Sequence, residues 1–346
     1  MVDVSDQGLP AKGMWSNVYL TTGRTTGMAT DAAADGSTML SPEEAFTVLG
    51  NEVRLEVLQT LGKADEPLAY SDLFEQMDYN DPGNFSYHLD QLVDHFVDKT
   101  DEGYVLHRTG ERVVEAILSG AVTTDPVREP SPTDKSCPFC SAPMEIGYRQ
   151  ERVTMYCSEC PGLYGHTDSE ESHPAESGTL GIIPLPPAGV KGRTAAEMHQ
   201  VAEIWTATTM QRIARGVCPR CSGTVERAVQ VCEFHDASDG LCDRCGLRLA
   251  ATASAVCTDC IFEMEAPVAG HLSVHPETMA FMIDHGIDPV APEGFLPFAA
   301  VDEEVRSRQP FEAQYKFTAD GERLTLTIDG DLVVGDVTRG PVPEAE

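Results

Sequence analysis

Apolar side chains recur every three or four positions through residues 41–120, which is the spacing of amphipathic helices. The spacing predicts helices over residues 42–49, 53–61, 71–77, 84–96 and 109–118, with Ser71 as the cap of the third and a turn at residues 81–83. Residues 97–100 and 104–107 flank the turn Asp101-Glu102-Gly103, which predicts a β-hairpin. We therefore expect a helical segment with one hairpin before its last helix.

After residue 136 the pattern changes to short alternating runs, which predict strands at 144–148 and 152–156, joined by a turn near Gln150. Unbroken runs at 224–231 and 247–256 predict two more strands. Residues 194–215 form a long helical pattern that Thr194 and Glu197 open as a capping box. Its apolar stripe predicts one buried face, made of Met198, Val201, Ile204, Trp205, Thr208 and Ile213.

The C-terminal region predicts a short helix over residues 276–285, ended by Gly286, and a small antiparallel meander from the alternation at 311–317 and 324–328. The fold class is therefore α+β. We divide the chain into a disordered N-terminal segment (1–40), a helical domain with a hairpin (41–120), a linker (121–136) and a first ribbon (137–161). An acidic and proline-rich connection (162–193), a helix (194–217), a second cysteine region (218–265), and a short helix with the meander (266–346) follow. Met28 is the expected translation start, because the composition becomes more acidic there.

Eleven cysteines all follow residue 136, and ten of them stand in Cys-x-x-Cys pairs. The lone Cys232 has His235 at the same spacing. Six two-ligand units make three four-ligand sites, which is typical of structural zinc, up to three ions. The predicted ligands are Cys137, Cys140, Cys157, Cys160, Cys218, Cys221, Cys232, His235, Cys242, Cys245, Cys257 and Cys260.

Other interpretations of the cysteines are weaker. Disulfides need an oxidising compartment, yet the chain shows no signal-peptide pattern, so a reduced cytoplasm is favoured. Cys137-Pro138-Phe139-Cys140 looks like a redox dithiol, but a second pair follows it closely. Iron in a rubredoxin-like site is the main alternative to zinc. His166 and His173 lie in the acidic loop and are expected to be solvated rather than ligands.

The pairing of the second cysteine region follows from strand length. Residues 224–231 and 247–256 contain no turn residue, so each strand separates its flanking cysteine pairs by about 25 Å. Antiparallel pairing then predicts an inner site, Cys232, His235, Cys242 and Cys245, and an outer site, Cys218, Cys221, Cys257 and Cys260. A conventional ribbon that joins Cys218 and Cys221 to Cys242 and Cys245 is the alternative.

Composition adds a strong acidic bias, with 56 acids against 24 bases and a formal net charge of −32. The apolar content of 41% is enough for a folded core, so the charge does not indicate disorder. Such a surface is typical of proteins from salt-loving archaea, where the Debye length is about 3 Å at molar salt. An acidic protein from an ordinary cell is the alternative. No apolar run is long enough for a membrane span.

Two segments of the helical domain carry a family resemblance, Leu49-Gly50-Asn51-Glu52-Val53-Arg54-Leu55-Glu56-Val57-Leu58 and Asn84-Phe85-Ser86-Tyr87-His88-Leu89-Asp90-Gln91-Leu92. Through them the domain resembles the ArsR-like winged helix-turn-helix regulators over about eighty residues. It implies a homodimer that places the second segment in the major groove of double-stranded DNA. No cysteine precedes Cys137, so the metal sensing of some relatives is not carried over. The cysteine region resembles a zinc-ribbon-like module appended to such a domain.

A helical projection of residues 84–96 puts Phe85, Leu89, Leu92 and Phe96 on the inner face. The polar residues opposite, and the bases of the hairpin and the helix after it, are the candidates for DNA contact. They are Asn84, Ser86, Tyr87, His88, Gln91, Lys99, Arg108 and Arg112. His88 has core packing as its alternative. The segment 41–120 holds seventeen acids against five bases, so phosphate neutralisation is weak and base-edge and shape contacts are expected to matter more.

We therefore expect a DNA-binding transcriptional regulator with a structural-zinc module for an unknown effector or a partner protein. The alternative is an adaptor that, like some basal transcription factors, combines a winged helix with a zinc ribbon and contacts the transcription machinery. A third reading is a redox sensor that ejects zinc on oxidation. No nucleophile–base set, phosphate loop or open metal site is visible, so an enzyme is not expected.

Overall fold

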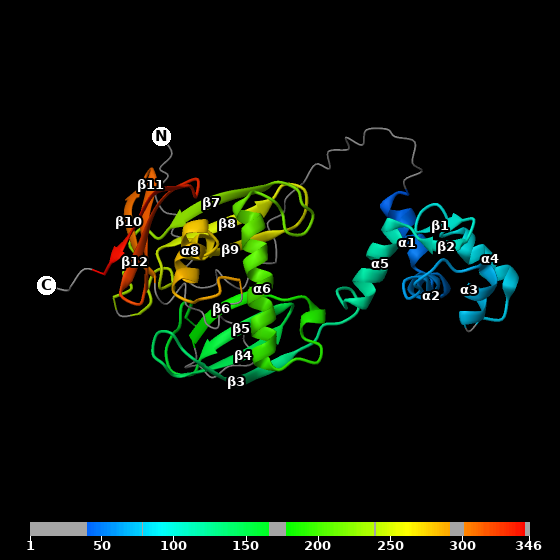
Figure 1. The fold of residues 1–346 in the computed structure, drawn as a ribbon, viewed down its shortest axis with the longest axis horizontal. Helices are drawn as coiled ribbons and strands as arrows, with labels where there is room; N and C mark the ends of the chain where they lie inside the picture. Colours follow the sequence, from blue (N-terminus) through cyan, green and yellow to red (C-terminus); the bar gives the residue numbers. More distant parts are fainter. Residues whose placement is uncertain (1–39, 78, 166–177, 239, 291–300, 343–346) are drawn as a thin grey trace, which may run out of the picture. The chain divides into compact units, whose positions relative to one another are not determined.

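The computed structural model describes residues 40–77, 79–165, 178–238, 240–290 and 301–342. These residues belong to two compact units, one ending at Thr124 and the other starting at Asp125. Helices and antiparallel sheets both occur, which confirms the predicted mixture of α and β structure. Figure 1 shows the elements of each unit. Among the residues described, no helix is both long and apolar enough to cross a membrane.

The first unit has helices before and after a hairpin. Its elements are α1 (Pro42–Leu49), α2 (Glu52–Leu61), α3 (Tyr70–Gln76), α4 (Pro82–Asp90), β1 (Val97–Thr100), β2 (Gly103–Leu106) and α5 (Arg108–Leu118). Strands β1 and β2 pair antiparallel. The core gathers residues from every helix after α1, with Phe85 of α4 at 0% exposure against the rings of Tyr70 and Phe74. Apolar periodicity therefore located this core correctly.

Three details of the first unit differ from the prediction. Helix α4 begins earlier, because Asp81 is its N-cap and accepts hydrogen bonds from the backbone N–H groups of Gly83 and Asn84. The same helix ends at Asp90 rather than residue 96. Asp94 has a positive φ of 68°, which turns the chain into β1. Ser71 is not a cap, since Ala69 holds that position and Ser71 lies in the first turn of α3.

The second unit begins with a four-stranded antiparallel sheet in the order β3-β4-β5-β6. The strands are β3 (Arg128–Ser136), β4 (Pro143–Arg149), β5 (Arg152–Cys157) and β6 (Gly178–Pro184), and the 3₁₀ helix η1 (Pro187–Gly189) follows. Strands β4 and β5 match the prediction. The linker predicted at 121–136 contains β3, a largely exposed edge strand, and edges tolerate its prolines. The predicted loop region 162–193 contains β6, whose Gly178 and Gly181 hid the strand pattern.

Helix α6 (Ala195–Ala214) lies along the first two of the three sheets of this unit, as Figure 1 shows. Its first half packs on the first sheet through Met198 and Ala202, and its second half packs on the next sheet through Met210 and Ile213. The predicted capping box of Thr194 and Glu197 is present. The predicted buried stripe is wrong in part, since Ile204, Trp205 and Thr208 are exposed and His199, Glu203 and Thr209 are buried. The small Ala202 marks the inner face, which a search for large apolar residues overlooks.

The next sheet has the order β7-β8-β9, with β7 (Val225–Val231), β8 (Ala251–Cys257) and β9 (Glu263–Pro267), and is followed by α7 (Val268–Leu272) and α8 (Pro276–Asp284). The predicted strand 247–256 starts later than expected, at Ala251. Residues 248–250 form bends instead of strand. Strand β9 and helix α7 were not predicted, because five residues are too few to show a period.

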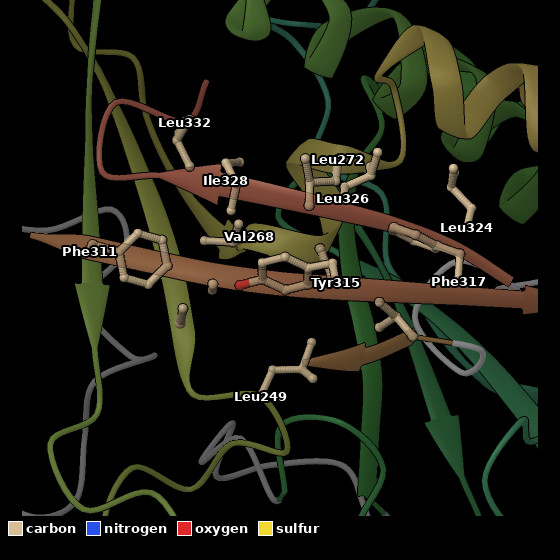
Figure 2. Packing of buried hydrophobic residues seen from close by; sticks show 14 of the residues in the cluster. Leu249, Val268, Leu272, Phe311, Tyr315, Phe317, Leu324, Leu326, Ile328 and Leu332 are labelled. Carbon is tan, nitrogen blue, oxygen red and sulfur yellow. The ribbon is translucent and has the colours of Figure 1, made fainter. Parts of the chain in front are cut away.

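The chain ends in a four-stranded meander in the order β10-β11-β12-β13. The strands are β10 (Val301–Arg308), β11 (Phe311–Ala319), β12 (Glu322–Asp329) and β13 (Val334–Pro341). The prediction found the two central strands but not the two polar outer ones. Figure 2 shows Phe311, Tyr315 and Leu326 of the meander packed with Val268 and Leu272 of α7. The meander therefore shares its core with the cysteine-bearing part of the unit.

Candidate metal centres

Twelve side chains gather into three groups of four in the second unit, and within each group the ligand atoms lie within 4.8 Å of one another. We call them the first centre, the outer centre and the inner centre. The first centre is Cys137, Cys140, Cys157 and Cys160; the outer centre is Cys218, Cys221, Cys257 and Cys260; the inner centre is Cys232, His235, Cys242 and Cys245. The inner and outer grouping is the pairing that strand length predicted. The conventional ribbon pairing is wrong.

Strand pairing explains this grouping. Strands β7 and β8 are antiparallel over their full length, from the pair Val225 and Cys257 to the pair Val231 and Ala251. One end of this ladder brings Cys221 to Cys257, whose sulfurs are 3.5 Å apart. At the other end, the backbone N–H of Cys232 donates to the carbonyl of Ala250 at 2.9 Å. The ligands at opposite ends of the two strands therefore belong to different centres.

Three Cys-x-x-Cys turns share one backbone geometry. In each, the N–H of the residue after the second cysteine donates to the carbonyl of the first cysteine. The N–H of the first cysteine donates to the carbonyl of the residue two positions after the second cysteine. The residue after the second cysteine has a positive φ, with values of 65° at Ser141, 64° at Ser222 and 72° at Gly246. Backbone N–H groups also point at sulfur, as from Phe139 to Cys137 at 3.4 Å and from Gly223 to Cys221 at 3.4 Å. The turns thus orient two sulfurs toward one point.

The distances fit zinc. A tetrahedral ion with Zn–S bonds of about 2.3 Å places its sulfurs about 3.8 Å apart. The sulfur pairs of Cys137 and Cys160, Cys140 and Cys157, and Cys218 and Cys260 are 3.6, 3.4 and 3.7 Å apart. In the inner centre, Cys245 Sγ and His235 Nδ1 are 3.5 Å apart, close to the edge expected for one nitrogen and one sulfur. Three sulfur-rich groups could therefore each bind a zinc ion with four protein ligands.

His235 has a second contact that sets its role. Its Nε2 lies 3.2 Å from the carbonyl oxygen of Arg248. The carbonyl only accepts, so Nε2 donates its N–H there, and the Nδ1 lone pair faces Cys245. This tautomer is the one that binds a metal ion through Nδ1. Arg248 also contacts the turn that follows β5, where its backbone N–H and its Nε donate to the carbonyls of Leu163 and Gly162 at 3.1 and 3.2 Å.

The thiol pKa values show why a cation suits these groups. Burial opposes ionisation of Cys242, but backbone N–H donors from Asp236, Cys245 and Arg244 outweigh it and lower the pKa to about 6. Burial, followed by the neighbouring Cys232, raises the pKa of Cys245 to about 12. The outer centre shows the same split, with the pKa of Cys218 lowered to about 7 and that of Cys260 raised to about 12. Close thiolates repel, so each group needs a cation to lose all of its thiol protons.

Two residues that support the inner centre were missed by sequence reasoning. One is Arg248, which nothing in the spacing distinguishes. The other is Glu303, which accepts hydrogen bonds from Tyr315 Oη at 2.7 Å, from the N–H of Ala251 at 3.2 Å, and from the N–H of Ala250. Glu303 stands between Val301 and Val305 at inward positions of β10, and an acid in an alternating apolar row was the signal for it.

The eight predicted DNA-contact residues lie in the first unit on and after α4. Asn84, Tyr87, Gln91, Lys99, Arg108 and Arg112 are exposed, and Ser86 is half-buried. His88 is buried at 8% exposure, with its Nδ1 3.3 Å from Arg54 Nη1, so it belongs to the packing. Burial and then the charge of Arg54 lower the pKa of His88. His166 and His173, considered as metal ligands, lie outside the described residues.

Comparison with known proteins gave two family matches. The model of a family described as a domain of unknown function (DUF7351) matches residues 134–334, which is more than half of the chain. A second model, also described as a domain of unknown function (DUF7347), matches residues 42–117. The first match contains all three candidate centres and the second contains α4. No curated protein and no solved structure matched the chain.

Proposed function

Because the chain belongs to the DUF7351 family, whose description names no activity, we propose its function from its residues: a DNA-binding transcriptional regulator of the ArsR-like type. Its first unit would bind double-stranded DNA as a winged helix-turn-helix homodimer. Its second unit would be stabilised by structural zinc and would receive an effector or a partner protein. The family resemblance of residues 49–58 and 84–92 supports the assignment of the first unit.

The observation that carries this proposal is the two-sided character of α4. Phe85 and Leu89 are almost fully buried, while Asn84, Tyr87 and Gln91 are exposed. Side-chain amides recognise base edges in the major groove, and tyrosine hydroxyls reach phosphates. Asn84 already donates from Nδ2 to Tyr79 Oη at 2.6 Å, which holds the amide on the outer face. The hairpin after α4 carries the exposed Lys99.

Exposed apolar side chains on the first and last helices of the first unit support the proposed dimer. Phe46 of α1 is 75% exposed, and Leu118 of α5 is 60% exposed. Large apolar side chains on exposed helical faces indicate a surface that a partner covers. A second copy of the same unit would cover both and would present two α4 helices to successive turns of DNA.

Zinc would serve the second unit as a closed structural ion. Each centre offers four protein ligands, which leaves no position for an activated water molecule. Bound zinc would hold the thiolates together and fix the turns that carry the strands. The regulator would therefore use these ions for folding, and no catalytic step is assigned to them.

The test is a selection of DNA fragments on the full-length protein in molar potassium chloride, followed by fluorescence anisotropy. We expect one sequence class to be enriched, and Asn84→Ala with Gln91→Ala to weaken its binding by about 1–3 kcal/mol for each lost base contact. Thr123→Ala, an exposed change after α5, is the matched control and should bind like the wild type. Equal affinity for all sequences, unaffected by the α4 variant, would contradict the proposal.

An adaptor of the transcription machinery is the second candidate, and one observation favours it. Arg108 is engaged by Glu111 and lies 3.8 Å from Glu115, so one of the three bases near the hairpin is already paired. Less positive charge then remains for phosphates. An adaptor would copurify with polymerase or another factor and would enrich no DNA sequence, so the same selection separates the two candidates.

A further inference from the structure

A small hollow lies between the second half of α6, the β7-β8-β9 sheet and α7. Met210 of α6, Met264 of β9, and Ala253 and Ala255 of β8 are among its lining residues. Two ionisable side chains also line it, Arg227 of β7 and His271 of α7. The hollow belongs to none of the three metal centres.

Small side chains create the space. Strand β8 reads Ala251-Thr252-Ala253-Ser254-Ala255, and Ala253 pairs with Ala266 of β9. Methyl groups at these positions do not fill the distance between the sheet and α6, although the surrounding residues are closely packed. The remaining room is about that of one water molecule or one methyl group.

Arg227 lies at this hollow with part of its guanidinium free. Its Nη1 donates to the carbonyl of Ala214 at 3.1 Å and lies 3.4 Å from His271 Nε2. Within the part of the chain that the structure describes, Nε and Nη2 make no hydrogen bond and no carboxylate pairs with Arg227. The parallel N–H groups of Nε and Nη2 match the two oxygens of a carboxylate. An arginine that pairs with none of the described carboxylates is unusual in a chain of net charge −32.

His271 holds the guanidinium in place without adding charge. It is buried at 8% exposure, and burial followed by the charge of Arg227 lowers its pKa to about 4. The imidazole is therefore neutral, and its Nε2 accepts a hydrogen bond from Arg227. Together with the carbonyl of Ala214 at the end of α6, it directs Nη1 inward, so the opposite edge of the guanidinium stays available.

We propose that Arg227 and this hollow together bind a short, unbranched monocarboxylate, of which only the terminal methyl group fits inside the space. The carboxylate would make two hydrogen bonds to Nε and Nη2 of Arg227, and the terminal methyl group would enter the space above Ala253 and Ala255. The size of the space selects acetate or propionate and excludes branched or aromatic acids. Its use as the effector site of the regulator rests on the proposed function, whereas the binding itself does not.

The experiment is isothermal titration calorimetry of the full-length, zinc-loaded protein at constant molar potassium concentration. Acetate and propionate are the probes, and acetamide and propionamide are neutral controls of the same shape. We expect saturable binding of the acids alone. Arg227→Gln should weaken it about tenfold or more, because a charged bidentate contact is lost. Arg212→Gln removes an exposed arginine that donates to the carbonyl of Pro219 and should leave binding unchanged.

A second variant tests the hollow independently of the charge. Ala253→Val fills the space while keeping Arg227, so it should also abolish propionate binding, and an unchanged circular dichroism spectrum would show that the sheet remains folded. The proposal is overturned if acids and amides bind alike, if isobutyrate binds as well as propionate, or if both variants bind like the wild type. A regulator that binds DNA but no carboxylate would remove this site and leave the proposed function standing.

Discussion

The guanidinium of Arg248 lies over the ring of Phe139, with Cζ 4.1 Å from the ring centroid. Phe139 stands between the two cysteines of the first centre's turn, and its backbone N–H donates to Cys137 Sγ at 3.4 Å. The carbonyl of Arg248 lies 3.2 Å from Nε2 of His235, a candidate ligand of the inner centre. One residue therefore links two centres whose ligands are far apart in the sequence.

This link predicts that Arg248→Met destabilises the second unit by about 1–2 kcal/mol, because a partly buried cation–π contact and a hydrogen bond to Gly162 are lost together. Chemical unfolding at constant molar salt measures the change. Arg244→Met is the matched control, since Arg244 also lies over a ring, that of Phe234 at 4.7 Å, but both side chains are exposed. Equal effects of the two variants would show that Arg248 contributes no special contact.

The grouping of ligands predicts how many ions double variants keep. The full-length protein should carry three zinc ions in native mass spectrometry, one for each centre. Cys232→Ser with Cys242→Ser changes only the inner centre, so it should lose one ion. Cys218→Ser with Cys257→Ser should likewise lose only the outer ion.

The conventional pairing makes the opposite prediction for both double variants. It would put Cys232 and Cys242 in different sites, and also Cys218 and Cys257, so each double variant would lose two ions. A single ion retained in both cases would therefore contradict the grouping. A wild-type protein that is folded without any bound transition metal would contradict the zinc assignment altogether.

A structural feature can be predicted from the sequence when it depends on residues that are neighbours in the chain. The Cys-x-x-Cys spacing and the unbroken run before Cys232 were enough to predict all three ligand groups, because a strand has a fixed rise per residue. The burial of Phe85 and Leu89 also followed from helical period. Glu303 and Arg248 act through partners more than fifty and eighty residues away, such as Ala250 and Gly162, and no local pattern shows such contacts.

The failures also have physical causes. The inner face of α6 carries Ala202, His199 and Glu203, whereas Ile204 and Trp205 face outward, so hydrophobicity alone assigned exposed residues to the buried face. Strand β3 was taken for a linker because its prolines and acids suit an exposed edge as well as a loop. The hollow at Arg227 was not expected, since the sequence records small residues on β8 but not what lies above them.

The contact between Glu303 and Tyr315 predicts the effect of Tyr315→Phe. The hydroxyl donates to Oε1 at 2.7 Å, and its removal leaves a buried carboxylate with one donor fewer. Burial already raises the pKa of Glu303, and losing this donor should raise it further. We expect a loss of about 1–3 kcal/mol in the free energy of unfolding at neutral pH.

The loss in Tyr315→Phe should shrink on mild acidification, because the protonated carboxyl needs fewer donors. Gln314→Ala, on the opposite face of β11, is the control and should have a small effect that does not depend on pH. Unfolding by guanidinium chloride at two pH values distinguishes the outcomes. A loss of equal size at both would show that the hydroxyl supports packing rather than the charge of Glu303.

The burial of the Glu203 carboxyl group predicts a pH dependence of stability that a single substitution at this position removes. It is buried on α6, its Oε1 lies 3.3 Å from His199 Nε2, and its Oε2 has no hydrogen-bond partner among the described residues. Burial raises its pKa to about 7 and lowers that of His199 to about 4. The folded state therefore holds a proton on Glu203 that the unfolded chain releases at a lower pH.

A raised carboxyl pKa makes stability fall as pH rises from the unfolded value, 4.5, to the folded value of about 7. His199 acts with the opposite sign, but only below its ordinary pKa of 6.5, so it contributes little at neutral pH. Between about pH 6 and about pH 8, Glu203→Gln should therefore gain about 1 kcal/mol relative to the wild type. Comparing the two proteins cancels protons taken up by the cysteines. A difference in unfolding free energy that stays constant across this range would show that Glu203 is ionised in the folded protein throughout.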